Sequence, residues 1–100
     1  MKRSLGFLLV LLLSTLLVSC LEKPREKRVL VFTKTAGFRH ASIEAGVIAI
    51  NKLGREQGFK VFHTEDASQF KEDFLSLFSA VVFLNTTGDV LDATQQAEFE

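Results

Sequence analysis

The sequence lacks most of the residues from which disulfides, metal sites and nucleotide sites are built. Cys20 is the only cysteine, so no internal disulfide can form. The two histidines stand apart, so no metal site is predicted, although one completed by residues beyond Glu100 stays open as an alternative. Neither G-x-x-x-x-G-K-[ST] nor G-x-G-x-x-G occurs, which excludes a P-loop and a dinucleotide fingerprint. The residues present do not identify a cofactor.

Residues 29–100 also lack an excess of positive charge. They hold six Lys or Arg against ten Asp or Glu, a net charge of −4. There is no basic patch and no aromatic stacking platform, so no nucleic acid is expected as a partner.

The first 20 residues have the pattern of an exported lipoprotein. Lys2 and Arg3 precede an apolar run from Leu5 to Val18, which is shorter than the about 20 residues of a membrane-spanning helix. The run ends in Leu-Val-Ser-Cys at Cys20, which resembles the lipobox of bacterial lipoproteins. This resemblance implies a signal peptide over residues 1–19, lipidation at Cys20 and a place on the outer side of a bacterial membrane. A secretory signal with a chance cysteine is the alternative.

Residues 20–28 are predicted to be the lipidated cysteine and a solvated tether, with the only proline, Pro24. Four basic residues against two acidic ones in residues 21–28 could favour anionic lipid headgroups, but a plain spacer is the expected role. Leu21, in place of an aspartate, favours outer-membrane sorting if the cell is Gram-negative.

The remaining residues alternate between apolar runs and amphipathic stretches. Strands are predicted over 28–33, 59–64 and 79–84, and the unbroken apolar character of the third predicts a central position. Helices are predicted from Ser42 as N-cap to Gly58, over about 69–77, and from a capping box at Asp92. This order predicts parallel βαβ units with right-handed crossovers.

The first predicted helix has one apolar stripe, and small residues beside it, Gly46 among them, predict a close approach to the sheet. A doubly wound sheet usually has five or more strands, so we expect residues 29–100 to be the amino-terminal part of such a domain, truncated at its end. A three-stranded mini-domain is the alternative, although it would leave a sheet edge exposed.

Two loops are expected to form a ligand site. In open parallel sheets, ligands bind at the carboxyl ends of the strands, where the strand order reverses. With a strand order of 2-1-3, loops 34–41 and 85–89 would be neighbours. The candidate residues are Lys34, Arg39, His40, Ser42, Asn85, Thr86, Thr87 and Asp89.

Each of these residues also has a plain structural explanation. Arg39 could be solvated, His40 could help to cap the helix, and the second loop is rich in turn-forming residues. His63 is expected to be exposed on an edge strand. Glu65 and Asp66 are expected to be turn carboxylates without a partner.

Three segments resemble a known family. The run from Val29 to Ser42, the segment 64–66 and the run from Ala80 to Leu91 look like ThuA-like domains, named for trehalose utilisation. The resemblance implies a three-layer αβα, flavodoxin-like sheet, as in class I glutamine amidotransferases. It also implies a role in using trehalose or a related disaccharide or keto-sugar, in some members beside sugar oxidoreductases or fused carbohydrate-related domains. No cysteine follows Cys20, so the amidotransferase nucleophile is missing and amide hydrolysis is not implied.

Two functions follow from these observations. In the first, an exported domain acts on a sugar, His40 transfers a proton, and Arg39, Thr86 and Asp89 position hydroxyl groups. In the second, the domain is a carbohydrate-binding or scaffold module without chemistry. The sequence alone leaves open whether the protein is an enzyme.

Overall fold

A computed structural model describes residues 25–100 of the chain. The predicted signal peptide, Cys20 and residues 21–24 of the predicted tether lie outside the described residues. Within residues 25–100, no helix is long and apolar enough to cross a membrane. The elements follow in the order β1 (Lys27–Phe32), α2 (Ser42–Gln57), β2 (Phe59–Thr64), η1 (Ala67–Gln69), α3 (Glu72–Leu75), β3 (Ala80–Phe83) and α4 (Ala93–Phe99).

The three strands form one parallel sheet, as predicted. Their order is β2-β1-β3, the order on which the expected meeting of the two site loops depends. β1 is the central strand, and its Leu30, Val31 and Phe32 are fully buried. The prediction that the third strand is central is wrong for the described sheet. β3 pairs with β1 alone, and its Ala80 and Phe83 are exposed. An apolar sequence shows that a strand can be buried, but it does not show where the strand lies in the sheet. Among the described residues, only β1 has a neighbouring strand on each side.

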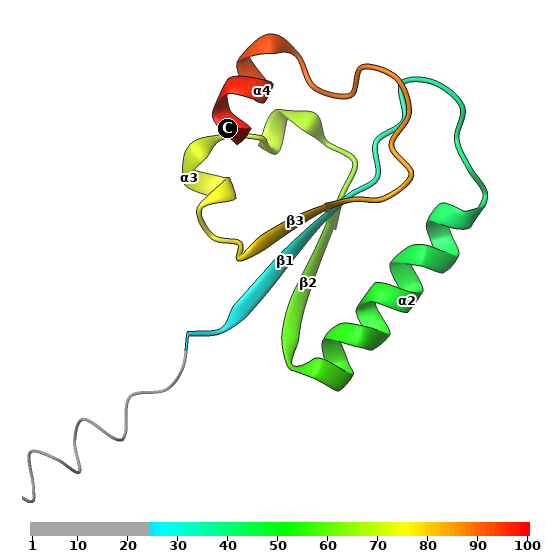
Figure 1. The fold of residues 1–100 in the computed structure, drawn as a ribbon, viewed down its shortest axis with the longest axis vertical. Helices are drawn as coiled ribbons and strands as arrows, with labels where there is room; N and C mark the ends of the chain where they lie inside the picture. Colours follow the sequence, from blue (N-terminus) through cyan, green and yellow to red (C-terminus); the bar gives the residue numbers. More distant parts are fainter. Residues whose placement is uncertain (1–24) are drawn as a thin grey trace, which may run out of the picture.

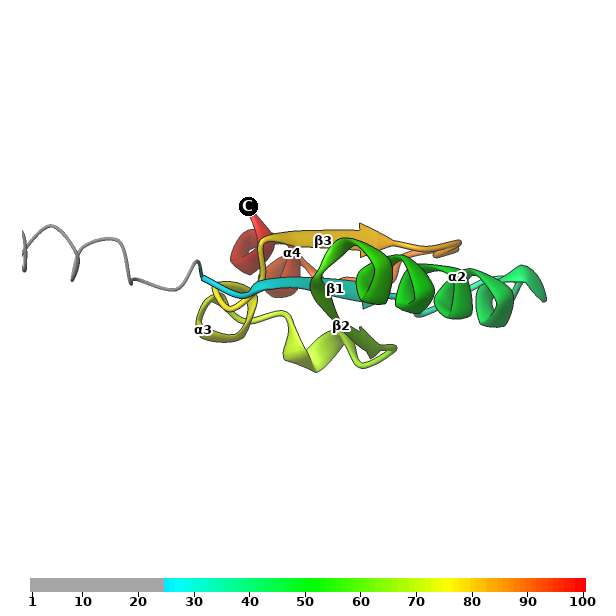
Figure 2. The same ribbon diagram turned by 90° about the horizontal axis from the view of Figure 1, so that it is seen from below.

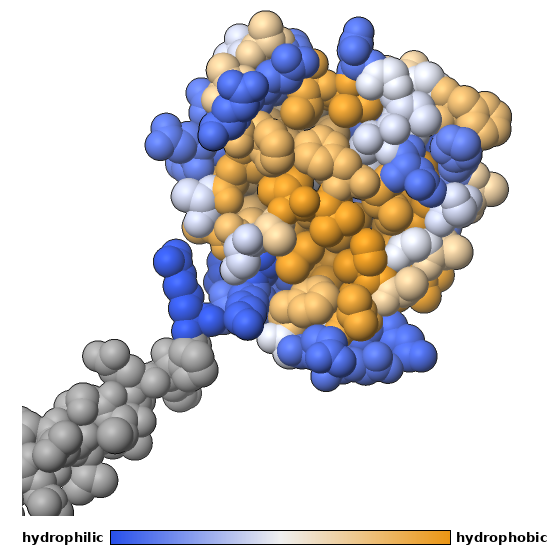
Figure 3. Space-filling model, in the orientation of Figure 1, coloured by the Kyte–Doolittle hydropathy of each residue, from blue (hydrophilic) through white to orange (hydrophobic). Residues whose placement is uncertain are grey.

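Helices lie on both sides of this sheet. α2 lies on one side, and η1, α3 and α4 lie on the other (Figures 1 and 2). The predicted three-layer αβα arrangement is therefore confirmed. The apolar surface visible in Figure 3 lies over the sheet between α2 and α4, where β3 has no outer neighbour among residues 25–100.

α2 packs closely because two of its glycines face the sheet. A Cβ at Gly46 would lie 2.8 Å from Leu84 Cδ2, and a Cβ at Gly54 would lie 2.7 Å from the Phe59 carbonyl oxygen. The predicted close approach at Gly46 is confirmed. Gly58 ends the helix in the left-handed region, at φ 80°, and its N–H donates to the Gly54 carbonyl.

Two helix predictions need correction. Ser42 is the first residue of α2 rather than its N-cap, because Ala41 already has helical angles and no side chain caps the helix. The predicted helix over 69–77 is broken into η1 and α3. Lys71 is extended between them, at φ −132° and ψ 146°. This break turns Phe70 into the core, where its ring centroid lies 4.6 Å from that of Phe32.

The capping box at the start of α4 is confirmed. Asp92 Oδ1 accepts from the Gln95 N–H, and Gln95 Oε1 accepts from the Asp92 N–H, both at 2.8 Å. Phe99, near the end of this helix, packs against Phe70 and Phe83 at centroid distances of 5.9 and 5.4 Å. α4 is thereby fixed on the side of the sheet that carries the phenylalanine core.

Candidate functional site

The two predicted site loops lie side by side at the carboxyl end of the sheet. Thr35 and Thr87 form a parallel bridge beyond the ends of β1 and β3. The Thr87 carbonyl accepts from the N–H groups of Ala36 and Gly37 at 2.8 and 3.1 Å, and the Thr87 hydroxyl donates to the Phe38 carbonyl at 2.6 Å. The expectation that these loops share one rim is confirmed.

The second loop is also attached to the start of α2. Asn85 Nδ2 donates to Ser42 Oγ at 2.7 Å. Asn85 has φ 50° and Gly88 has φ 74°, so the residues before and after Thr86 and Thr87 both have left-handed backbone conformations. A Cβ at Gly88 would lie 3.1 Å from the Gly37 nitrogen, and glycine there lets the two loops approach.

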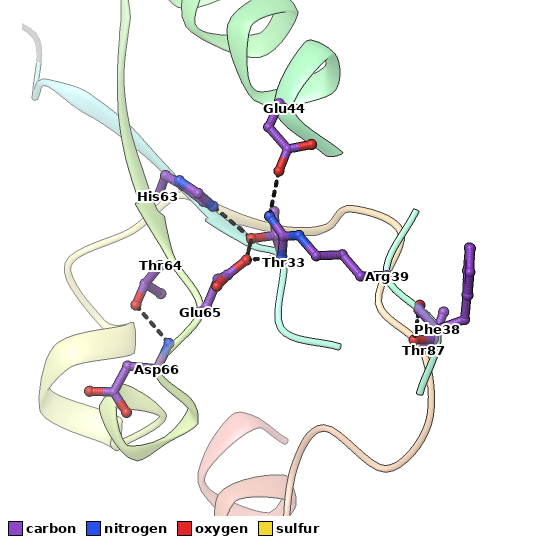
Figure 4. A network of polar contacts seen from close by, with 9 residues as sticks. All are labelled: Thr33, Phe38, Arg39, Glu44, His63, Thr64, Glu65, Asp66 and Thr87. Atoms are coloured by element: carbon purple, nitrogen blue, oxygen red, sulfur yellow. Dashed lines mark hydrogen bonds and ion pairs between the residues drawn. The ribbon is translucent and has the colours of Figure 1, made fainter. Parts of the chain in front are cut away.

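Arg39 joins the first loop to two other segments. Its guanidinium donates to Glu44 Oε1 in the first turn of α2 at 2.7 Å, and to Glu65 Oε1 after β2 (Figure 4). Glu65 was expected to have no partner, and this expectation is wrong. Asp66 also has a partner, because its carboxylate accepts from the Ser68 N–H and hydroxyl and so caps η1.

The network continues into the sheet through Thr33, a fully buried polar residue. Its Oγ1 lies 2.6 Å from His63 Nε2 and donates to Glu65 Oε1 at 3.2 Å (Figure 4). A hydroxyl has one proton and a carboxylate can only accept, so Thr33 donates to Glu65 and His63 donates from Nε2. His63 is exposed on an edge strand, as predicted, yet it serves to satisfy the buried threonine.

These contacts set the charge of the rim. Hydrogen bonds from Arg39 lower the pKa of Glu65 and of Glu44, and both carboxylates raise the pKa of Arg39. Hydrogen bonds from Ser68 lower the pKa of Asp66. The rim therefore holds ionised carboxylates around an arginine whose charge is already compensated.

The remaining candidate side chains have fewer contacts. The His40 ring is exposed and lies edge-on against the Phe38 ring, with centroids 5.1 Å apart. The backbone carbonyl of His40 accepts from the Ile43 N–H. Lys34, Thr86 and Thr87 are half-buried, and Asp89 is exposed. Within residues 25–100, no three His, Cys, Asp or Glu residues are grouped as metal ligands. The ligand roles of these residues stay predictions.

A separate cavity of about 730 Å³ lies between α3 and the start of α4. It is lined by exposed polar residues such as Glu72, Asp92 and Thr94, and it shares no residue with the two loops. We base the candidate site on the loops because hydrogen bonds hold them together at the carboxyl ends of the strands.

Sequence reasoning missed Thr33, His63 and Glu65 as parts of one network. The signal was available, because β1 and β2 are parallel and Val31 lies opposite His63 in the register. Residues just beyond the two strands must therefore be neighbours. The contact of Arg39 with Glu65 depends in addition on how the loop after β1 folds.

Comparison with known proteins identifies a family. No curated protein and no solved structure matches the chain significantly. The family model described as ThuA, trehalose utilisation, matches residues 28–100. This range includes both loops of the rim and all three strands, except for Lys27 at the start of β1. The protein therefore belongs to the ThuA family.

Proposed function

We propose that the protein is exported, anchored by lipid at Cys20, and binds and converts trehalose or a related disaccharide or keto-sugar at the rim formed by loops 34–41 and 85–89. The observation that carries the proposal is the bonding of these loops through Thr87, which holds Lys34, His40, Thr86 and Asp89 on neighbouring segments. Such a set of hydroxyl, carboxylate and cationic groups suits a polyhydroxylated ligand.

The charge of the rim favours a neutral sugar over a phosphorylated one. The Arg39 guanidinium already donates hydrogen bonds to Glu44 and Glu65, and these carboxylates compensate the positive charge that would attract a phosphate. Together with the neighbouring carboxylates of Glu44, Glu65 and Asp66, the charged loop residues Lys34, Arg39 and Asp89 make two cations and four carboxylates, a net charge of −2. The net negative charge of this region would repel an anionic sugar such as a sugar phosphate.

The proposal is tested by calorimetric titration of the complete protein with trehalose and with trehalose 6-phosphate. Trehalose should bind more tightly, and Thr86→Val should weaken its binding roughly threefold to tenfold, as expected for one lost hydrogen bond. Thr94→Val, on exposed α4, removes an equivalent hydroxyl away from the rim and should leave binding unchanged. Equal effects of the two variants would rule out the rim.

Catalysis is tested separately at His40. His40→Ala should abolish turnover of the sugar, followed by chromatography, while the thermal unfolding midpoint stays unchanged because the ring is exposed. Turnover equal to that of the unsubstituted protein would remove His40 from the mechanism.

A second function, a binding module without chemistry, is favoured by one observation. Among the described residues, the His40 side chain has no hydrogen-bonding partner to fix its tautomer and orientation, unlike a general base held by a third group. Saturable trehalose binding without any product after prolonged incubation would establish this second function and exclude the first.

A further inference from the structure

An apolar groove lies at the edge of β2, away from the candidate site. It has a volume of about 400 Å³ and is lined by apolar side chains of β2, α3 and the segment after α3, with Arg28 and Lys60 at its border. The groove lies toward the starts of β1 and β2, whereas the rim lies at the ends of these strands (Figure 1). The saccharide proposal therefore makes no use of it.

The floor of the groove is an aromatic cluster that is only half covered. The Phe62 ring lies 5.6 Å from that of Phe74 and 6.0 Å from that of Phe78, measured between centroids. Even so, Phe62 is 44% exposed and Leu77 is 49% exposed. β2 pairs only with β1, so nothing in the described residues covers its outer side.

Two cationic residues, Arg28 and Lys60, line this apolar surface, and two more precede it in the chain. Arg25, Lys27, Arg28 and Lys60 lie on the starts of β1 and β2 or just before them, and Glu26 is the one carboxylate among them. Glu26 also lines the groove and pairs with Arg28 at 3.3 Å, which leaves Lys60 as the uncompensated cation of the lining. The carboxylates of Glu72 and Asp73 line the separate cavity beside α4 instead.

The groove lies beside the point where the amino-terminal segment joins the described residues, and this position bears on what the groove contacts. The residues before Arg25 join the described part beside the groove, because Glu26 and Arg28 line it. The segment after α3 is also bonded to β1, because the Ser79 N–H donates to the Arg28 carbonyl at 2.7 Å. Cys20 is five residues before Arg25, a span of at most about 18 Å when fully extended. A lipid chain on Cys20 would therefore keep the groove within reach of the bilayer surface.

We propose that this groove docks on an anionic membrane surface, with Phe62 and Leu77 in the interfacial region and the flanking Lys and Arg residues against lipid headgroups. Apolar side chains beside cations are the combination that binds the bilayer interface. Docking would turn the rim away from the lipid and toward the solvent that holds the sugar. The inference rests on the proposed anchoring but not on the saccharide site.

The test uses the absence of tryptophan and tyrosine from the sequence. Phe62→Trp in the full chain introduces a single emitting group, which is studied in vesicles of phosphatidylcholine and phosphatidylglycerol with brominated acyl chains. We expect its emission to shift to the blue and to be quenched. Leu77→Trp is the second reporter, in case the substitution at Phe62 disturbs the cluster. Ile48→Trp is the matched control, because Ile48 is 68% exposed on α2 and away from the groove.

All three variants share the same amino-terminal segment, so differences in quenching report orientation rather than attachment. Equal quenching at Phe62→Trp and Ile48→Trp would overturn the proposal. A blue shift without quenching would also overturn it, since a second copy of the chain would then cover the groove. Adding Lys60→Glu to Phe62→Trp should weaken docking by about fivefold or more, the factor expected for one cation at an anionic surface.

Discussion

At the scale of single residues, Arg39 joins segments that are far apart in the sequence. It connects the loop after β1 to Glu44 in α2 and to Glu65 after β2. Glu65 in turn accepts from the buried Thr33 hydroxyl. A residue that looks like a free ligand-binding cation in the sequence therefore serves first to hold the rim together.

Glu65→Gln should reduce stability in a way that depends on pH. Arg39 lowers the pKa of Glu65 in the folded state below the ordinary value of 4.5. A carboxylate with a lowered folded-state pKa contributes stability above its unfolded pKa and loses it as the pH falls through the folded pKa. We therefore expect the variant to be less stable than the unsubstituted protein at pH 7, with the gap closing as the pH falls below about 4.5.

Urea denaturation at a series of pH values measures this gap. Glu56→Gln is the matched control, because Glu56 is an exposed carboxylate at the other end of α2, paired with Lys52 at 3.8 Å. The interpretation would be contradicted by a gap for Glu65→Gln that is constant across the acidic range.

The residue scale also shows what the sequence could and could not predict about the site. The two loops were expected to meet if the parallel strands had the order β2-β1-β3. The structure shows this order and the contact between the loops. The Arg39–Glu65 pair was missed because the loop conformation is not encoded in any periodicity. Ser42 was assigned a capping role, whereas its hydroxyl accepts from Asn85, a contact that depends on how the second loop folds.

At the scale of elements, the fit of α2 to the sheet depends on glycines that lie against different kinds of neighbour. The atoms nearest to a Cβ at Gly46 belong to the Leu84 side chain, which can move. At Gly54 the nearest atom is the Phe59 carbonyl oxygen at 2.7 Å, and Val61 Cγ2 follows at 3.0 Å. The backbone oxygen belongs to the start of β2 and cannot move without shifting the strand.

Gly54→Ala should therefore destabilise the protein by about 1–3 kcal/mol, the usual cost of overpacking, even though alanine is the better helix former. Gly46→Ala should have a smaller effect, because about 1 kcal/mol of gained helix propensity offsets the adjustment of Leu84. Thermal unfolding of both variants checks the order. A greater loss for Gly46→Ala than for Gly54→Ala would contradict this account.

The elements differ in how well the sequence predicted them. The long helix α2 has a repeating apolar stripe and a glycine stop, and its end at Gly58 was predicted. The region 67–75 has the same helical spacing of phenylalanines, yet it folds into two short helices. Local hydrogen bonds from Ser68 to Asp66 compete with a continuous helix there, and burial of Phe70 is gained by breaking it.

At the scale of the whole molecule, one aromatic core joins the sheet to the helices on one of its sides. The Phe70 ring lies 4.6 Å from that of Phe32 in β1, 6.0 Å from that of Phe83 in β3 and 5.9 Å from that of Phe99 in α4. Phe70 itself belongs to the link between η1 and α3. Phe83 of β3 also contacts Phe99 directly, at 5.4 Å, but Phe70 is the fully buried ring that contacts all three elements.

Phe70→Ala should consequently destabilise the protein by about 3–5 kcal/mol, the cost of removing a buried phenylalanine and leaving a cavity. Phe38→Ala removes the same side chain from a site that is 74% exposed, and it should change stability by no more than about 0.5 kcal/mol. Because small domains are stable by only about 5–15 kcal/mol, the first variant should show a much lower urea midpoint while the second does not. Similar midpoints for the two variants would mean that Phe70 is not the residue through which β1, β3 and α4 are coupled.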